Sequence, residues 1–114
     1  MPPTSAPALV TIDTSTLTRA LYSSDASLYR VVPRGVVIPR TADELGRAVD
    51  AALAERTPIT LRGAGTSCAG NAVGPGLVLA TANHLTAVLD VDPERALAVV
   101  ELSLIHISEP TRPY

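Results

Sequence analysis

The sequence predicts a mixed α+β fold with the element order α, β, α, β, long loop, β, β, β. A capped amphipathic stretch that begins at Thr41 predicts one well-formed helix. Short apolar runs rich in Val, Ile and Leu, separated by Gly and Pro, predict strands on either side of a glycine-rich loop. The 114 residues include no Phe or Trp, so the core has to be built from Val, Leu, Ile and Ala.

The first part of the chain predicts little regular structure. Residues 1–14 are rich in proline and small residues, and we expect them to be disordered. They carry neither a positively charged region nor an apolar stretch, which argues against a signal peptide. A Ser/Thr N-cap and spaced apolar side chains predict a short helix over Ser15–Leu21. Residues 22–30 break that spacing and are expected to be irregular.

The next two elements are a strand and the capped helix. The β-branched run Val36–Ile38 predicts a strand that ends at Pro39. After it, the hydroxyl of Thr41 and the carboxylate of Glu44 match a capping box, in which each group caps the other's backbone N–H. We expect the helix to end near residues 56–57 and to bury one apolar stripe, which consists of Leu45, Val49, Ala52 and Leu53.

Four more strands are predicted. Ile59–Leu61 leads into the glycine-rich loop, and Leu77–Ala80 follows the loop. Residues 87–91 and 96–101 flank an Asp-Pro-Glu-Arg turn, so the pair predicts a hairpin. Residues 102–107 are apolar enough to extend the last strand.

The loop Arg62–Asn71 carries the chemistry that the sequence suggests. Gly63 and Gly65 lack a Cβ, so their backbone can approach a ligand closely. Successive N–H groups in such a turn converge on an anion, and the hydroxyls of Thr66 and Ser67 add donors. A cofactor with a diphosphate would suit this loop. A plain solvent-exposed turn has the same composition, and the local pattern leaves both interpretations open.

Two common phosphate-binding loops do not fit. A dinucleotide fingerprint needs a third glycine where this chain has Cys68, and a Walker-type loop needs a lysine that is absent here. Both loops also open a helix. Helix formation after Cys68 is opposed by Gly70, Gly74, Pro75 and Gly76.

Composition excludes several other functions. The net charge of −2 and the absence of a basic cluster argue against binding nucleic acid or an anionic membrane. The single cysteine, Cys68, is not accompanied by clustered His or Cys, so no metal site is expected. No apolar run reaches the ~20 residues of a transmembrane segment. We therefore expect a soluble, cytoplasmic protein.

Taken in order, four segments resemble the N-terminal flavin-binding domain of the FAD-linked oxidases. They are Tyr22–Ser27, Val36–Pro39, Arg62–Asn71 and Gly76–Leu79. This vanillyl-alcohol-oxidase or PCMH-type fold is shared with bacterial D-lactate, glycolate and 2-hydroxyglutarate dehydrogenases. The resemblance implies that residues 15–101 are the first lobe of such a domain, which is incomplete. Tyr22–Ser27 looks most like the dehydrogenases with a C-terminal iron–sulfur part, so a cluster would belong to a part that is missing here.

The resemblance also implies roles for the loop and its neighbours. The backbone N–H groups of Gly63, Ala64, Gly65, Thr66 and Ser67 would hold the FAD pyrophosphate, and Gly70 and Asn71 would lie on the ribityl or isoalloxazine side. Pro39 would lie near the adenine or simply end its strand. Arg62 would either supply charge to the phosphates or point into solvent. For Tyr22, Ser24 and Asp25 the resemblance names no chemical role beyond packing onto a later domain.

The resemblance implies an FAD-dependent oxidoreductase that transfers a hydride from a 2-hydroxy acid to FAD. Relatives with covalent flavin often carry a histidine where this chain has Thr66 and Ser67, so we expect non-covalent FAD; His84 is expected at the surface. No catalytic residue can be assigned, the electron acceptor is open, and the piece alone is expected to be inactive. The alternatives are a small non-enzymatic domain, or a cell-wall precursor reductase or sugar-lactone oxidase of the same fold.

The end of the chain does not match the resemblance. Residues 103–114 look like the translation of a sequencing adapter joined to a truncated reading frame. We therefore expect residues 102–114 to be non-native, with the second lobe and the substrate-binding domain missing.

Overall fold

The computed structural model describes residues 10–103 and confirms the mixed α+β fold. The expected non-native tail falls almost wholly outside these residues. No helix in the described part is long and apolar enough to cross a membrane. The elements are α1 (Thr16–Leu21), β1 (Gly35–Val37), α2 (Ala42–Ala54), β2 (Ile59–Arg62), β3 (Leu77–Ala80), β4 (Val88–Asp92) and β5 (Leu97–Val100).

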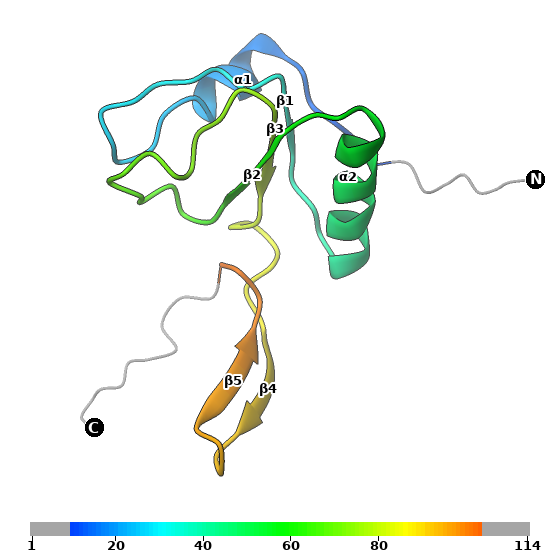
Figure 1. Ribbon diagram of the computed structural model, residues 1–114, viewed down its shortest axis with the longest axis vertical. Helices are drawn as coiled ribbons and strands as arrows, with labels where there is room; N and C mark the ends of the chain where they lie inside the picture. The colour runs from blue at the N-terminus through cyan, green and yellow to red at the C-terminus, as the bar shows by residue number, and fades with distance from the viewer. Residues whose placement is uncertain (1–9, 104–114) are drawn as a thin grey trace, which may run out of the picture.

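Three parallel strands form the main sheet in the order β1-β3-β2. Strands β1 and β2 are joined through α2, and β3 then enters between them (Figure 1). All four residues of β3 are buried. Successive side chains of β3 point to opposite faces of the sheet. Leu77 and Leu79 belong to the buried cluster on the first face, and Val78 and Ala80 to the cluster on the other face.

Helix α2 covers the first face. Ala48 and Ala52 are buried against the sheet, with Leu45 and Val49 packed beside them. The expected stripe is wrong in one member, because Leu53 is 68% exposed. Ala48, four residues before Ala52, lies on the buried side of the helix and takes the place expected for Leu53.

The cap of α2 differs in one partner from the expected capping box. The Thr41 hydroxyl accepts from the Glu44 N–H at 3.1 Å, as expected. The Glu44 carboxylate, however, accepts from the backbone N–H of Arg40 rather than that of Thr41, at 2.9 Å, and from the Arg40 guanidinium at 2.9 Å. These contacts with Arg40 hold the pKa of Glu44 below its ordinary value. Hydrogen bonds that involve two successive residues, Arg40 and Thr41, therefore fix the start of α2.

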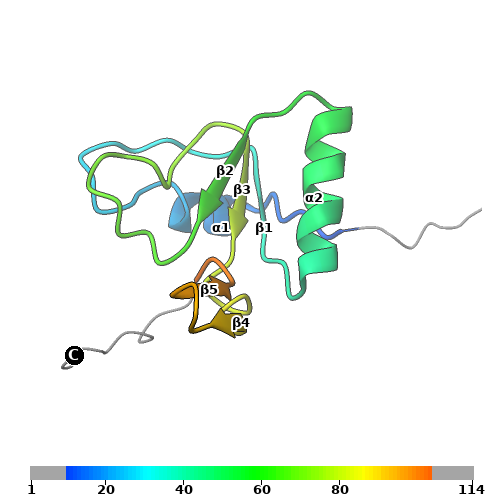
Figure 2. The same cartoon turned by 60° about the horizontal axis from the view of Figure 1, so that its bottom comes forward.

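The other face is contacted from the end of α1. Figure 2 shows α1 and α2 on different sides of the sheet. Tyr22, at the end of α1, packs against the cluster of Val36, Val78 and Ala80. Residues 10–14, which we expected to be disordered, lie along the sheet: Asp13 pairs with Val36 through two backbone hydrogen bonds of 2.8 and 3.0 Å. Residues 1–9 lie outside the described part.

Strands β4 and β5 form the expected hairpin, which is a separate antiparallel sheet. It extends away from the three-stranded sheet (Figure 1), and nearly all its residues are exposed. The expected extension of β5 does not begin, because Leu102 and Ser103 form a turn. Residues 104–107 of that expected extension are not among the described ones.

Candidate functional site

The glycine-rich loop begins at the carboxyl edge of the parallel sheet. Because β1, β2 and β3 run parallel, their carboxyl ends share this edge. Gly63 follows β2 directly, and Pro39 follows the end of β1. With β3 between them, the two strand ends are about 10 Å apart. Pro39 is fully buried, so its pyrrolidine ring packs inside the protein at the end of β1.

The backbone of the loop leaves a run of donors free. Gly65 has φ +75° and Gly70 has φ +86°, which are conformations that favour glycine. Within residues 10–103, the N–H groups of residues 63–67 donate to no protein acceptor. These five residues are half-buried or exposed, so a ligand can reach them. Free successive N–H groups are what an anion-binding loop requires.

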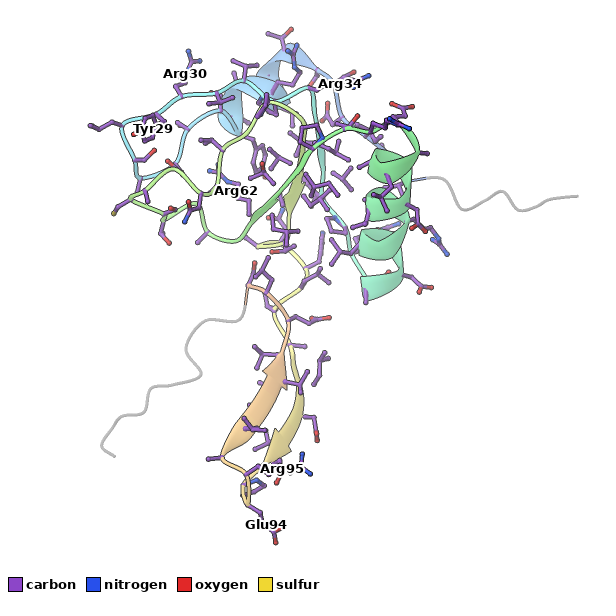
Figure 3. All side chains as sticks on the ribbon, viewed as in Figure 1. Tyr29, Arg30, Arg34, Arg62, Glu94 and Arg95 are labelled. Atoms are coloured by element: carbon purple, nitrogen blue, oxygen red, sulfur yellow. The ribbon has the colours of Figure 1, made fainter. Side chains whose placement is uncertain are left out.

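The Arg62 side chain is held by three contacts within the protein. Its Nη1 donates to the carbonyl of Ser24 at 2.8 Å and to that of Ala72 at 3.3 Å. The guanidinium also lies 5.1 Å from the centre of the Tyr22 ring. Figure 3 shows the side chain between the two loop segments that these residues belong to. Arg62 is therefore bound by the protein and does not point into solvent.

The Tyr22–Ser27 segment lies against the glycine-rich loop. Asp25 accepts from the Ala72 N–H at 3.2 Å and from the Ser27 N–H at 2.8 Å, and the Ala26 N–H donates to the Gly65 carbonyl at 3.1 Å. Hydrogen bonds from Ser27, together with those from Ala72 and the charge of Arg62, hold the pKa of Asp25 below its ordinary value. Asp25 and Ser27 have the spacing of an Asx turn, which is the one local signal for this contact in the sequence.

The second half of the loop is held by its own side chains. The Ser67 hydroxyl accepts from the N–H groups of Ala69 and Asn71, at 3.3 and 3.1 Å. At Gly70, an added Cβ would come within 2.7 Å of the Tyr29 ring, so this glycine is packed on an aromatic side chain. Thr66 and Ala64 remain exposed. The N–H groups of Ala69 and Asn71 are thus bound by Ser67, whereas those of residues 63–67 have no acceptor within residues 10–103.

A groove adjoins the first half of the loop. It has a volume of about 310 Å³ and is lined by Leu21, Tyr22, Arg62, Gly63, Ala64, Ala80 and Ala82. Backbone donors beside small apolar side chains suit a ligand that combines a diphosphate with flat organic groups. A second hollow, of about 250 Å³ near Ile12 and Arg34, lies at the opposite edge of the sheet and does not reach the loop.

Other reactive groups do not gather at the loop. Cys68 and His84 are both exposed. Within residues 10–103, no three His, Cys, Asp or Glu side chains lie close enough to hold a metal ion. The chemistry that this part of the chain offers is therefore binding by backbone donors.

Comparison with known proteins agrees with this geometry. The model of the FAD binding domain family matches residues 33–104. The chain is 34% identical over 95 residues to glycolate oxidase subunit GlcD of Bacillus subtilis, covering 82% of this chain and 20% of that protein. It is 30% identical over 95 residues to D-2-hydroxyglutarate dehydrogenase of Escherichia coli, covering 81% of this chain and 9% of that protein. The chain therefore spans a fifth or less of these relatives, and it belongs to the FAD-binding domain family.

Proposed function

We propose that residues 63–67 bind the pyrophosphate of FAD in an FAD-dependent oxidoreductase of which this chain is one part. The observation that carries the proposal is the run of N–H groups at residues 63–67, which have no acceptor among residues 10–103. The chain's membership of the FAD-binding domain family supports FAD as the diphosphate ligand. Gly70 and Asn71 would then face the flavin end of the cofactor.

The chain's own contribution is to hold and orient the cofactor. Gly65, with its positive φ, turns the loop so that neighbouring N–H groups can meet one anion. The exposed Thr66 hydroxyl is available as a further donor. When bound, FAD supplies a hydride acceptor, and the protein around it supplies orientation and electrostatics.

We propose a 2-hydroxy acid as the substrate. The two relatives support this choice, because their names specify glycolate and D-2-hydroxyglutarate, which are both 2-hydroxy acids. Oxidation of such a substrate breaks the C–H bond at its α-carbon and passes a hydride to the flavin, while the hydroxyl loses a proton. No group within residues 10–103 is assigned as the base for that proton.

We also propose that FAD is bound without a covalent bond. The loop presents Thr66 and Ser67 where a covalent attachment would need a nucleophile such as histidine, and His84 lies beyond β3. Denaturing the flavin-loaded product of the complete gene with acid should release all its flavin into the supernatant. Flavin absorbance that stays with the precipitated polypeptide would contradict this.

The phosphate site can be tested with a pair of variants that differ only in charge. Thr66→Glu places a carboxylate next to the proposed pyrophosphate, whereas Thr66→Gln has nearly the same shape without the charge. In the product of the complete gene, Thr66→Glu should weaken FAD binding about tenfold, which is about 1.4 kcal/mol. Thr66→Gln should bind like the wild type. The measurement is the FAD dissociation constant of the apoprotein from flavin fluorescence.

A second variant tests the backbone rather than the charge. Gly65→Val forces a β-branched side chain onto φ +75° and into the Arg62 guanidinium, 2.5 Å from the added Cβ, and should abolish flavin retention. Gly46→Val, in a helix position with open space around the added Cβ, is the control. Equal affinity in the two Thr66 variants would remove the loop from the site. A colourless wild-type protein that binds no added FAD would favour the non-enzymatic alternative.

A further inference from the structure

We propose that Arg62 and Asp25 are positioning residues that clamp the glycine-rich loop onto the Tyr22–Ser27 segment and so direct its N–H groups outward. This inference rests on the proposed function, in which those N–H groups bind the FAD pyrophosphate. It assigns to the Tyr22–Ser27 segment the task of shaping the phosphate site without touching the phosphate.

The Arg62 side chain ties the two ends of the loop together. Arg62 is the last residue of β2, and its Nη1 donates to the carbonyl of Ala72, ten positions later, at 3.3 Å. The same atom donates to the Ser24 carbonyl at 2.8 Å, so three segments meet at one nitrogen. The guanidinium lies directly under the turn, because a Cβ added to Gly65 would be 2.5 Å from Nη2.

Asp25 fixes the far end of the loop from the other side. Its carboxylate accepts from the Ala72 N–H at 3.2 Å, while the Ala72 carbonyl accepts from Arg62 at 3.3 Å. Both polar groups of Ala72 are thus bound, and its side chain is only 6% exposed. Asp25 itself is held by the Ser27 N–H at 2.8 Å, which keeps the carboxylate aimed at the loop.

The contact at Gly65 sets the direction of the next donor. The Ala26 N–H donates to the Gly65 carbonyl at 3.1 Å, so that carbonyl points toward the Tyr22–Ser27 segment. Within residues 10–103 all peptide bonds are trans. In a trans peptide the carbonyl and the following N–H point in opposite directions. The N–H of Thr66 therefore points away from the segment, and it donates to no acceptor within residues 10–103.

The clamp assigns Arg62 a role other than that of a phosphate ligand. Its guanidinium lies among two carbonyls, the Tyr22 ring and the nearby charge of Asp25. A lysine would keep the charge but lose the planar fork and the stacking. If Arg62 acted as a charge for the phosphates, Arg62→Lys would preserve FAD binding, whereas the clamp predicts that it does not.

The test uses the product of the complete gene and two probes, FAD and riboflavin. Riboflavin lacks the pyrophosphate, so a clamp that orders the phosphate loop should matter for FAD alone. Arg62→Lys and Asp25→Ala should each raise the FAD dissociation constant about tenfold, as expected when one charge-assisted hydrogen bond is lost. The riboflavin dissociation constant should stay unchanged, and the apoprotein should still unfold in a single cooperative transition. Arg47→Lys and Asp50→Ala, on exposed positions of α2, are matched controls.

The double variant sharpens the result. Because both side chains hold Ala72, Arg62→Lys combined with Asp25→Ala should weaken FAD binding by much less than the product of the two single effects. FAD affinity like that of the wild type in both single variants would overturn the clamp and leave the proposed function intact. An equal loss of FAD and riboflavin would show that the residues only support the fold. A wild-type protein that binds neither probe would contradict the proposed function itself.

Discussion

Strand β3 and the hairpin of β4 and β5 are all built on short apolar runs, but their environments are opposite. β3 and β5 consist only of Val, Leu and Ala, whereas β4 also carries Asp90 and Asp92. Each run predicts a strand. All four residues of β3 are buried, and Leu79 is fully covered. All four residues of β5 are exposed, and Leu97 is 57% exposed. A strand sequence therefore says little about how well the strand is covered.

The difference lies in the neighbours of each strand. Strand β3 pairs on both edges, with β1 and β2, and α2 and Tyr22 cover its two faces. The hairpin strands pair only with each other, and an isolated two-stranded hairpin is marginally stable in water. The hairpin exposes a set of large apolar side chains, namely Val88, Leu89, Val91, Leu97, Val99 and Val100. The three-stranded sheet is stabilised by burial, whereas the hairpin depends mainly on its own backbone hydrogen bonds.

The largest effect is expected for Leu79→Ala in the central strand. Leu79 is fully buried between β1, β2 and α2, so its truncation removes a large apolar side chain and leaves a cavity. The free energy of unfolding should fall by about 2–5 kcal/mol. Urea unfolding of the chain, followed by circular dichroism, measures this. A loss below about 1 kcal/mol would mean that β3 is not the centre of the core.

A smaller effect is expected at the helix that covers β3. Thr41→Ala removes the hydroxyl that accepts from the Glu44 N–H and should reduce the free energy of unfolding by about 1 kcal/mol. Thr41→Ser keeps the hydroxyl and is the matched control. In the same urea experiment, equal stabilities of the Ala and Ser variants would show that Arg40 and Glu44 fix the helix start without Thr41.

The sequence predicted the elements well because their signals are local. The Thr41 cap, Pro39 after the first strand, Pro58 before the second and the Asp-Pro-Glu-Arg turn all act within a few residues. The helices and strands begin and end within two or three residues of their expected bounds. The strand order β1-β3-β2 was not predicted, since it depends on which apolar runs pair at long range. The exposure of Leu53 was missed because Ala48, a small residue, fills the buried position.

In the candidate site, too, local features were predictable from the sequence and long-range contacts were not. The loop between β2 and β3 and its glycines were predicted from local composition, and Gly65 adopts the positive φ that a glycine allows. The position of the Arg62 side chain was not predicted, because its partners Ser24 and Ala72 lie 38 and 10 residues away in the sequence. Sequence spacing gives no hint that a side chain at the end of β2 reaches a carbonyl near α1. Composition shows which groups can bind an anion, and only the folded chain shows which of them are already bound by the protein.

The smallest effect is expected for Leu97→Ala, the hairpin counterpart of Leu79→Ala. Leu97 lies opposite Asp92 at the end of the hairpin and is already 57% exposed, so truncation removes few contacts. The free energy of unfolding should change by no more than about 0.5 kcal/mol. The measurement should be made at two protein concentrations. A loss as large as that of Leu79→Ala, growing with concentration, would mean that the exposed apolar face of the hairpin is buried against a second copy of the chain in solution. In that case its apolar side chains would contribute to stability as those of β3 do, through a neighbour from another molecule.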